Sequence, residues 1–367
     1  MRGIMVHSLM SRGVSFDDAY RVANAVREKI RGRGVVTPKD LVQAAREFLG
    51  APEAPEEFPP VRQPQLILVT GAGKEAPFSK GLFSQSLLAA AIEPSDAFDV
   101  AREIERELLR RGAPEVARSE LRRLAVEALE RKADERAAQR YLAWRRHRDA
   151  EKPMILLLGG AAGVGKTSLA YEVAYRLEIH RIVSTDAIRQ VMRIMLSPDL
   201  VPAIHTSSYS AHRVVAERAG GEDPVVEGFR AQATTVSVGV RAMMDRAAAE
   251  NTSMILEGVS VVPGLIDLER YAELAHVIFL LVASLDEGAF TTRFSARAKN
   301  AARRPPHRYL ENLDSILKIQ DYLLELAEAE GIPIVVNSRF DTSVTSIIRH
   351  VTETLRKRSE LDAADPA

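Results

Sequence analysis

The segment Met154-Ile-Leu-Leu-Leu-Gly-Gly-Ala-Ala-Gly-Val-Gly-Lys-Thr-Ser168 decides the fold of this chain. An apolar run typical of a buried strand leads into the pattern G-x-x-x-x-G-K-T at Gly160–Thr167, and a helix-forming sequence follows. Backbone N–H groups of such a loop curl around a β-phosphate, and the helix N-terminus adds partial positive charge. The alternative is a tight strand–helix turn that holds no ligand. The sequence therefore predicts that the chain binds a nucleoside triphosphate.

The residues of this loop have distinct expected roles. Lys166 can reach the β- and γ-phosphate oxygens and is a candidate catalytic residue, and the Thr167 hydroxyl suits Mg²⁺. We therefore expect ATP and Mg²⁺ as the bound species. The expected nucleotide-binding residues of the loop are Gly160, Gly163, Gly165, Lys166, Thr167 and Ser168.

From residue 150 to residue 358, apolar strands alternate with amphipathic helices. This alternation predicts an α/β domain of the P-loop NTPase type, with a parallel sheet and helices on both faces. The last residues, 359–367, are polar and are expected to form a flexible tail.

The N-terminal region is expected to be mostly helical. Residues 1–50 carry apolar side chains at three- and four-residue spacing, and the acidic, proline-rich stretch 51–64 indicates a linker. An internal repeat relates the first residues to a segment 78 positions later. The identical residues are Gly3, Ser8, Leu9, Asp18, Ala19, Val22, Ala23, Arg33 and Gly34. The repeat indicates a duplicated helical unit, and a shared amphipathic pattern is the alternative.

The second copy is the more complete one, and over residues 65–149 it resembles an ATP-cone, a small nucleotide-sensing module. The resemblance rests on a strand followed by Gly71-Ala-Gly-Lys74, on Pro77-Phe78 and Lys80 at a helix start, and on Arg118. It implies nucleotide sensing, whereas packing or homo-oligomerisation through the N-terminal region is the alternative.

Composition restricts the remaining classes of function. The 367 residues have a formal net charge of zero, 5% aromatic residues and no cysteine, which excludes disulfides, thiolate zinc sites and cysteine nucleophiles. The zero net charge gives no support to a nucleic-acid or membrane partner. No apolar run reaches the roughly 18–20 residues of a membrane span, and the N-terminus is too weakly apolar for a secretory signal. We expect a cytoplasmic protein.

Polar residues follow two predicted strands at the edge where a parallel sheet opens onto its ligands. Asp186 follows the strand 181–184, where it can orient or deprotonate an attacking hydroxyl, cap the next helix, or do both. Arg189 and Arg193, one turn apart on that helix, suit an anionic substrate or surface salt bridges. Glu257 ends an apolar strand at the Walker B position, and we expect it to hold Mg²⁺ through water or to order the nucleophile.

A basic segment further along is expected to close over the phosphates and neutralise the transferring group, as in small-molecule kinases. Its cations are Arg293, Arg297, Lys299, Arg303, Arg304 and Arg308. We expect Arg293 and Arg297 to be catalytic, Arg304 to bind the nucleotide and Arg308 to bind the acceptor. The alternative is a solvated basic helix.

Two further groups of residues have expected binding roles. Ser208, Tyr209, Arg230 and Gln232 belong to insertions at the place where such kinases bind the acceptor, and we expect them to hold its carboxylate or phosphate oxygens. Asn337 follows the last predicted strand, and we expect it to line the pocket of the nucleotide base.

Together, these motifs resemble the 2-phosphoglycerate kinase family over almost the whole chain. They are Ser184-Thr-Asp-Ala-Ile-Arg189, His205-Thr-Ser-Ser-Tyr209, Gly228-Phe-x-x-Gln232, Glu257-Gly258-Val-x-x-x-Pro-Gly264 and Arg308-Tyr-Leu-Glu-Asn312. The resemblance implies transfer of the ATP γ-phosphoryl group to the 3-hydroxyl of 2-phosphoglycerate, giving 2,3-bisphosphoglycerate and ADP, with Gly258 among the acceptor contacts. The family pattern has a histidine where this chain has Ser260, and that position bears on the acceptor's identity.

Other functions remain open on the sequence. A regulatory P-loop ATPase would use the cone-like region to sense nucleotide, and a related kinase would act on another anionic hydroxy acid. A kinase that acts on nucleic-acid ends would need a basic groove with aromatic side chains that stack on the bases. The zero net charge and the 5% aromatic content argue against that third function.

Overall fold

The computed structural model describes residues 16–29, 44, 47–48, 67–71, 74–112, 114–149, 152–215, 223–286, 288 and 307–364. The chain divides into two compact units, residues 1–65 and residues 66–367. The predicted linker 51–64 and the residues Arg293, Arg297 and Arg304 lie outside the described residues.

Helix α2 (Phe16–Lys29) belongs to the first copy of the sequence repeat and buries one apolar face. Its buried residues include Val22, Ala23 and Val26. The residues 78 positions later are Val100, Ala101 and Ile104, which are buried on helix α5 (Pro94–Arg111). The two copies therefore agree in secondary structure and in the buried face, as expected for a duplicated helical unit.

The region that resembles an ATP-cone combines a small sheet with helices. Strand β1 (Leu68–Gly71) pairs antiparallel with β2 (Lys74–Pro77) and parallel with β3 (Glu115–Ala117). The helices of this region are α4 (Lys80–Leu88), α5, α6 (Arg118–Lys132) and α7 (Glu135–Asp149). At Gly71 the φ angle is +144°, and a Cβ there would lie 3.3 Å from the side chain of Arg118. Two residues on which the resemblance rests, Gly71 and Arg118, thus lie in direct contact.

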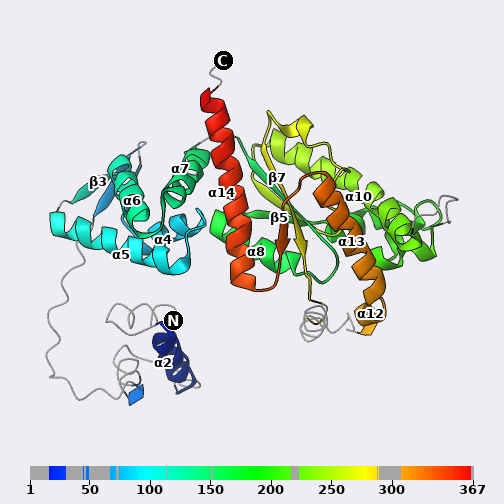
Figure 1. Cartoon of the computed structure of the whole chain (residues 1–367), viewed down its shortest axis with the longest axis horizontal. Coiled ribbons are helices and arrows are strands. Elements are labelled where there is room, and N and C mark those ends of the chain that lie inside the picture. The colour runs from blue at the N-terminus through cyan, green and yellow to red at the C-terminus, as the bar shows by residue number, and fades with distance from the viewer. Residues whose placement is uncertain are drawn as a thin grey trace. The chain divides into compact units, whose positions relative to one another are not determined.

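The P-loop region has a parallel sheet in the order β5-β6-β4-β7-β8, with the strand of the P-loop at its centre (Figure 1). The strands are β4 (Met154–Gly159), β5 (Arg181–Ser184), β6 (Met254–Glu257), β7 (His276–Ala283) and β8 (Ile334–Val336). The α-helices are α8 (Lys166–Leu177), α9 (Thr185–Met195), α10 (Pro224–Ala249), α12 (His307–Leu310), α13 (Leu313–Ala329) and α14 (Phe340–Ala364). Short 3-10 helices are η1 (Pro202–His205), η2 (Ser208–Arg213) and η3 (Glu269–Tyr271).

Helices cover both faces of this sheet, as predicted. Successive residues of a strand point to opposite faces. Leu156 and Leu158 of β4 join a core cluster with α8 and α14, whereas Ile155 and Leu157 join a second cluster with α10. Helices α8 and α14 lie side by side in Figure 1, and α13 contacts α10 and β7. The predicted fold class, a P-loop parallel sheet preceded by a mostly helical cone-like region, is confirmed.

Residues 359–367 were predicted to form a flexible tail, and the backbone is helical over the first part of this segment. The flexibility of the tail stays a prediction. Helix α14 continues to Ala364, and its buried residues pack against α7 and α8. Arg140 of α7 pairs with Glu353 of α14 at 3.5 Å. Among the helices in the described ranges, none combines the length and the apolar character needed to cross a membrane.

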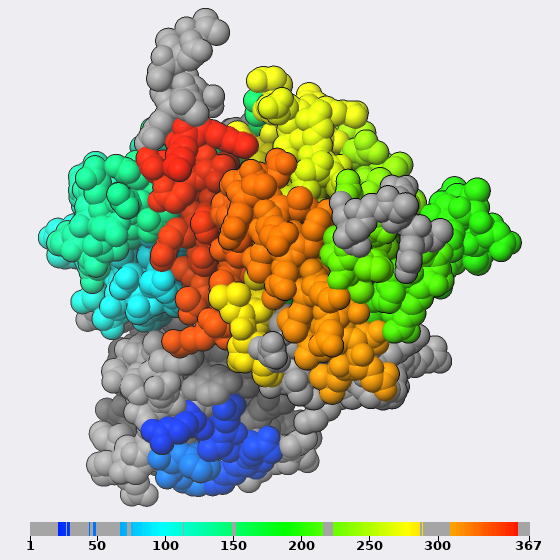
Figure 2. Space-filling view, turned by 45° about the vertical axis from the view of Figure 1, so that its right-hand side comes forward, coloured from blue at the N-terminus to red at the C-terminus, as the bar shows by residue number. Residues whose placement is uncertain are grey.

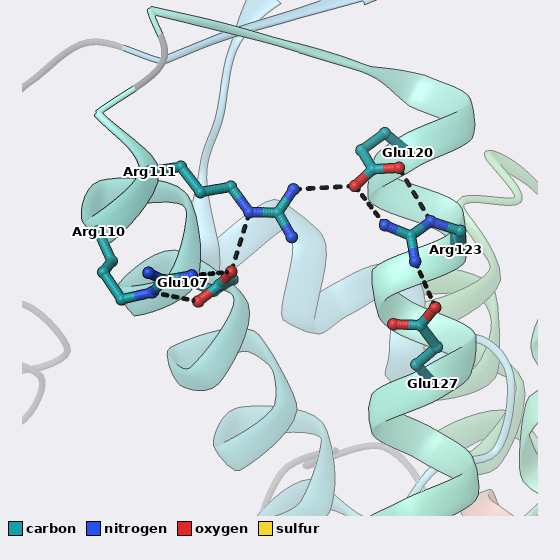
Figure 3. A network of polar contacts seen from close by, with 6 residues as sticks. All are labelled: Glu107, Arg110, Arg111, Glu120, Arg123 and Glu127. Atoms are coloured by element: carbon teal, nitrogen blue, oxygen red, sulfur yellow. Dashed lines mark hydrogen bonds and ion pairs between the residues drawn. The ribbon is translucent and has the colours of Figure 1, made fainter.

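A network of exposed ion pairs links α5 to α6 (Figure 3). Arg111 at the end of α5 bonds Glu107 of its own helix and Glu120 of α6, both at 2.9 Å. Hydrogen bonds from Arg110 and then Arg111 lower the pKa of Glu107 to about 2. Hydrogen bonds from Arg123 and then Arg111 likewise lower the pKa of Glu120 to about 2. Arg111 is therefore the bridge between two otherwise separate carboxylates.

Replacing Arg111 by Met should raise the pKa of both carboxyl groups towards the ordinary value of 4.5. Since the native pKa values lie below 4.5, the stability that the network supplies is present above pH 4.5 and is lost as the pH falls towards 2. A carbon-detected NMR titration of the Glu side chains measures the shift. The control is Arg131→Met, because Arg131 pairs with Glu103. Unchanged titration of Glu107 and Glu120 in Arg111→Met would contradict the prediction.

Candidate active site

The P-loop is shaped by glycines that lie against the backbone of neighbouring segments. A Cβ on Gly160, whose φ is +141°, would lie 2.2 Å from the carbonyl oxygen of Val282 in β7. Gly163 and Gly165 have φ angles of +87° and +93°, in the region that favours glycine. The loop therefore needs glycine at these positions for its conformation and, at Gly160, for close contact with the sheet.

Two side chains of the loop face charged or polar partners. Lys166 is buried, and its Nζ donates to the carbonyl oxygen of Ala161 at 2.7 Å. The Thr167 hydroxyl donates to Oε1 of Glu257 at 3.0 Å. Glu257 is only 4% exposed and ends β6, the strand next to β4. The residues predicted from the Walker A and Walker B patterns therefore meet in the fold, while Ser168 lies exposed beside them.

The donor set at this point fits Mg²⁺. A hydroxyl and a carboxylate are hard oxygen ligands, and Mg²⁺ is usually held by one or two such groups together with waters and substrate phosphates. Among the residues that the structure describes, no group of three or more His, Cys, Asp and Glu side chains is arranged to hold a metal ion. The arrangement at Thr167 and Glu257 is thus one that suits an ion delivered with a nucleotide.

The ends of three strands lie at one level of the sheet. Glu257 is in register with Ser184 of β5 on one side and with Leu158 of β4 on the other. Asp186, the P-loop and Glu257 therefore emerge at the same edge. The Ser184 hydroxyl accepts a hydrogen bond from the Ala187 N–H and caps α9. The alternative that Asp186 is the helix cap is thus wrong, and its side chain, 56% exposed, lies at the edge of the sheet.

Gly258, expected to contact the acceptor, lies against Thr185. A Cβ on Gly258, whose φ is +151°, would lie 1.8 Å from the Thr185 hydroxyl oxygen. The Gly258 N–H donates to the carbonyl oxygen of Leu158 at 3.0 Å. The contact between Thr185 and Gly258 joins the start of α9 to the end of β6, and no local pattern marks Thr185 for this role. Ser260, two residues on, is buried.

Arg189 and Gln232 hold the chain segment that contains η1. Arg189 donates to the carbonyl oxygens of Ile204 and Thr206 at 3.0 and 2.8 Å, and to Asp186 at 3.3 Å. Gln232, 1% exposed, donates to the carbonyl oxygens of Ala203 and Thr206. The carbonyl of Thr206 thus accepts from both side chains. These contacts tie the predicted acceptor segment to α9 and α10.

Helix α10 is the platform for η2. A Cβ on Gly228 would lie 2.2 Å from the backbone nitrogen of His212, so α10 contacts the backbone of η2 directly. Tyr209 is buried, and its ring meets the ring of Tyr309 in α12 edge-on, with centroids 5.9 Å apart. Arg213 donates to Oδ1 of Asn312 at 3.0 Å. The predicted acceptor segment is therefore fixed to the residues that follow the basic segment.

The remaining residues that were predicted to bind the acceptor differ in burial and in hydrogen bonding. Ser208 is buried and Arg230 is exposed on α10. Arg193 donates to Gln190 at 3.3 Å, and its buried Nε has no hydrogen-bond partner among the described residues. The side chain of Arg308 lies outside the described residues. In Figure 2 the residues that follow β5, coloured green, form a lobe at the right of the molecule.

Asn337 occupies a place that the sequence did not suggest. Its side-chain Nδ2 donates to the carbonyl oxygen of Val164 inside the P-loop at 2.8 Å. A residue expected near the nucleotide base therefore contacts the phosphate-binding loop. No local sequence signal indicates this contact, because the two residues are 173 positions apart.

Gly258→Ala should destabilise the protein more than Gly264→Ala. Both glycines have positive φ, but at Gly264 a Cβ would meet only Glu330 Oε1 at 3.5 Å, whereas at Gly258 it would overlap Thr185. We expect about 1–3 kcal/mol of strain for Gly264→Ala and a clearly larger loss for Gly258→Ala. Denaturant titration measures both. Equal losses would show that Thr185 does not crowd this position.

Comparison with known proteins supports the assignment of the two regions. Residues 67–150 match the family described as ATP cone domain. The chain is 34% identical over 287 residues to a 2-phosphoglycerate kinase of Pyrococcus horikoshii, covering 78% of this chain and 93% of that protein. For the 2-phosphoglycerate kinase of Methanocaldococcus jannaschii the identity is 36% over 296 residues, covering 81% and 94%. For that of Methanopyrus kandleri it is 38% over 292 residues, covering 79% and 88%.

These alignments are longer than the segment from residue 150 to the C-terminus at residue 367, so the similarity extends beyond the P-loop region. The resemblance indicated by the motifs is confirmed. The chain belongs to the 2-phosphoglycerate kinase family.

Proposed function

We propose that this chain is a kinase that transfers the γ-phosphoryl group of ATP to the 3-hydroxyl of 2-phosphoglycerate, giving 2,3-bisphosphoglycerate and ADP. The observation that supports this most is the hydrogen bond between Thr167 and Glu257 beside the buried Lys166. The relatives that match this chain over most of their own length carry the name 2-phosphoglycerate kinase.

The donor half of the site is the P-loop. Its backbone N–H groups and Lys166 would bind the β- and γ-phosphate oxygens, and the N-terminus of α8 would add positive potential. Thr167 and Glu257 would hold Mg²⁺, which when bound neutralises charge on the phosphates. Because phosphoryl transfer needs little covalent chemistry from the protein, positioning and charge are the main contributions of these residues.

The acceptor half is proposed at the neighbouring strand end. Asp186 would orient the attacking hydroxyl or accept its proton, and Arg189 holds this carboxylate at 3.3 Å. Arg193 and Arg230 carry positive charge for the anionic groups of the acceptor. Arg189 and Gln232 already bond backbone carbonyls, so we assign them to positioning of the acceptor segment. Ser208, Tyr209 and Gly258 remain acceptor contacts in this proposal.

The roles of the arginines in the basic segment are proposed from the sequence alone. Arg293, Arg297 and Arg304 lie outside the described residues, and of Arg308 only the backbone is described. We propose that they neutralise the transferring group and the acceptor. The cytoplasmic location, the absence of a nucleic-acid partner, homo-oligomerisation and the domain boundaries stay predictions.

A coupled assay of ADP release tests the acceptor. With Mg·ATP, we expect 2-phosphoglycerate to stimulate ADP release and to be consumed, whereas 3-phosphoglycerate and glycerate serve as controls without stimulation. Stimulation by a different phosphorylated hydroxy acid would identify a related acceptor. ADP release that is indifferent to every acceptor would overturn the proposal in favour of a regulatory ATPase.

Two substitutions separate the halves of the site. Lys166→Ala should abolish transfer, because the ammonium group that contacts the phosphates is lost. Asp186→Asn should lower kcat by roughly 10²- to 10⁴-fold and leave KM for ATP unchanged, as expected for loss of a general base. The control is Asp199→Asn, an exposed carboxylate after α9. Full turnover in Lys166→Ala, or equal effects at Asp186 and Asp199, would refute the assigned roles.

A further inference from the structure

The residue after β8 connects the edge of the sheet to the P-loop. The backbone N–H of Asn337 donates to the carbonyl oxygen of Ala283, the last residue of β7, at 2.8 Å. Asn337 is 5% exposed, and its Nδ2 donates to the carbonyl oxygen of Val164 at 2.8 Å. Asn337 is thus fixed by the sheet on one side and bonds the P-loop on the other.

The hydrogen bond to Val164 determines the direction of the next backbone N–H. The peptide group between Val164 and Gly165 is planar and trans, so its C=O and N–H point in opposite directions. With the carbonyl directed at Asn337, the Gly165 N–H must point away from Asn337. Backbone N–H groups of the P-loop are the donors that surround the β-phosphate.

The side chain of Asn337 packs closely against Gly165. A Cβ on Gly165 would lie 2.6 Å from Nδ2 of Asn337, and the φ of Gly165 is +93°. Glycine is therefore needed here for the backbone conformation and for the space that the Asn337 amide occupies. The amide in turn lies directly against the peptide that it orients.

We propose that Asn337 is a positioning residue, which sets the Gly165 N–H for the β-phosphate of the nucleotide by holding the carbonyl of Val164. The inference rests on the proposed function only in that the P-loop binds a nucleotide, and it replaces the expected contact of Asn337 with the base. A donor that is already oriented before the phosphate arrives needs no reorganisation on binding. Asn337 thus acts on phosphate affinity through Val164.

The test compares nucleotides with and without a β-phosphate in the full chain. In Asn337→Ala, we expect Mg·ADP to bind roughly three- to tenfold more weakly, the effect of one neutral hydrogen bond, with AMP affinity unchanged. KM for ATP should rise by a similar factor while KM for the acceptor stays constant. Isothermal titration and competition with a fluorescent ADP analogue measure these affinities.

The matched control is Ser343→Ala. The Ser343 hydroxyl donates to the carbonyl oxygens of Val336 and Arg339, so it supports the same strand end, and within the described part of the chain it makes no hydrogen bond to the P-loop. We expect its nucleotide affinities to equal those of the wild type. Asn337→Leu is the second variant, since it keeps the branched shape of the side chain and lacks the N–H donor. It should show the same loss for Mg·ADP even if Asn337→Ala folds poorly.

The outcomes separate this inference from the proposed function. Equal loss of AMP and Mg·ADP affinity would indicate a contact with the base or ribose and would overturn the positioning role. Wild-type Mg·ADP affinity in Asn337→Leu would overturn it as well. If the wild-type protein itself binds no Mg·ADP, then the kinase proposal fails first.

Discussion

The contact between the P-loop backbone and the segments on either side of β4 is the constraint on which the rest of the site depends. A Cβ on Gly159 would lie 2.5 Å from the carbonyl oxygen of Val261, and one on Gly160 would lie 2.2 Å from that of Val282. Side chains are excluded at this point, so the loop lies in contact with backbone on both sides. This contact places Thr167 within hydrogen-bond distance of Glu257 and brings Val164 to Asn337.

The polar residues of the site divide into those already bonded within the fold and those left at its edge. Arg189, Gln232 and Asn337 each hold backbone carbonyls and thereby shape the acceptor segment or the P-loop. The Asp186 side chain is largely exposed although Arg189 donates to it, and the Nε of Arg193 has no partner among the described residues. Since an orphaned buried donor is costly, buried groups whose hydrogen bonds are already made suit positioning, whereas exposed or unbonded groups suit ligand contact.

Much of the fold followed from local patterns in the sequence. The P-loop, the apolar strands of the central sheet and the cone-like helices were predictable because each is specified by neighbouring residues. The continuation of α14 to Ala364 was not, since it extends a helix whose earlier turns are held by packing on α7 and α8. The sequence offered Asp186 as a possible cap of α9, and only the geometry showed that the Ser184 hydroxyl accepts the Ala187 N–H instead.

The sequence alone determined that this chain has a phosphate-binding loop, a carboxylate at the end of the neighbouring strand and the motifs of its family. It did so because residue type, glycine spacing and periodicity act over a few positions. Tertiary structure decided which side chains shape the site and which face the ligand. Asn337 and Val164 are 173 positions apart, and Gln232 lies 26 positions from Thr206. Such pairs meet only through the packing of the sheet and its helices, so no local pattern encodes their hydrogen bonds.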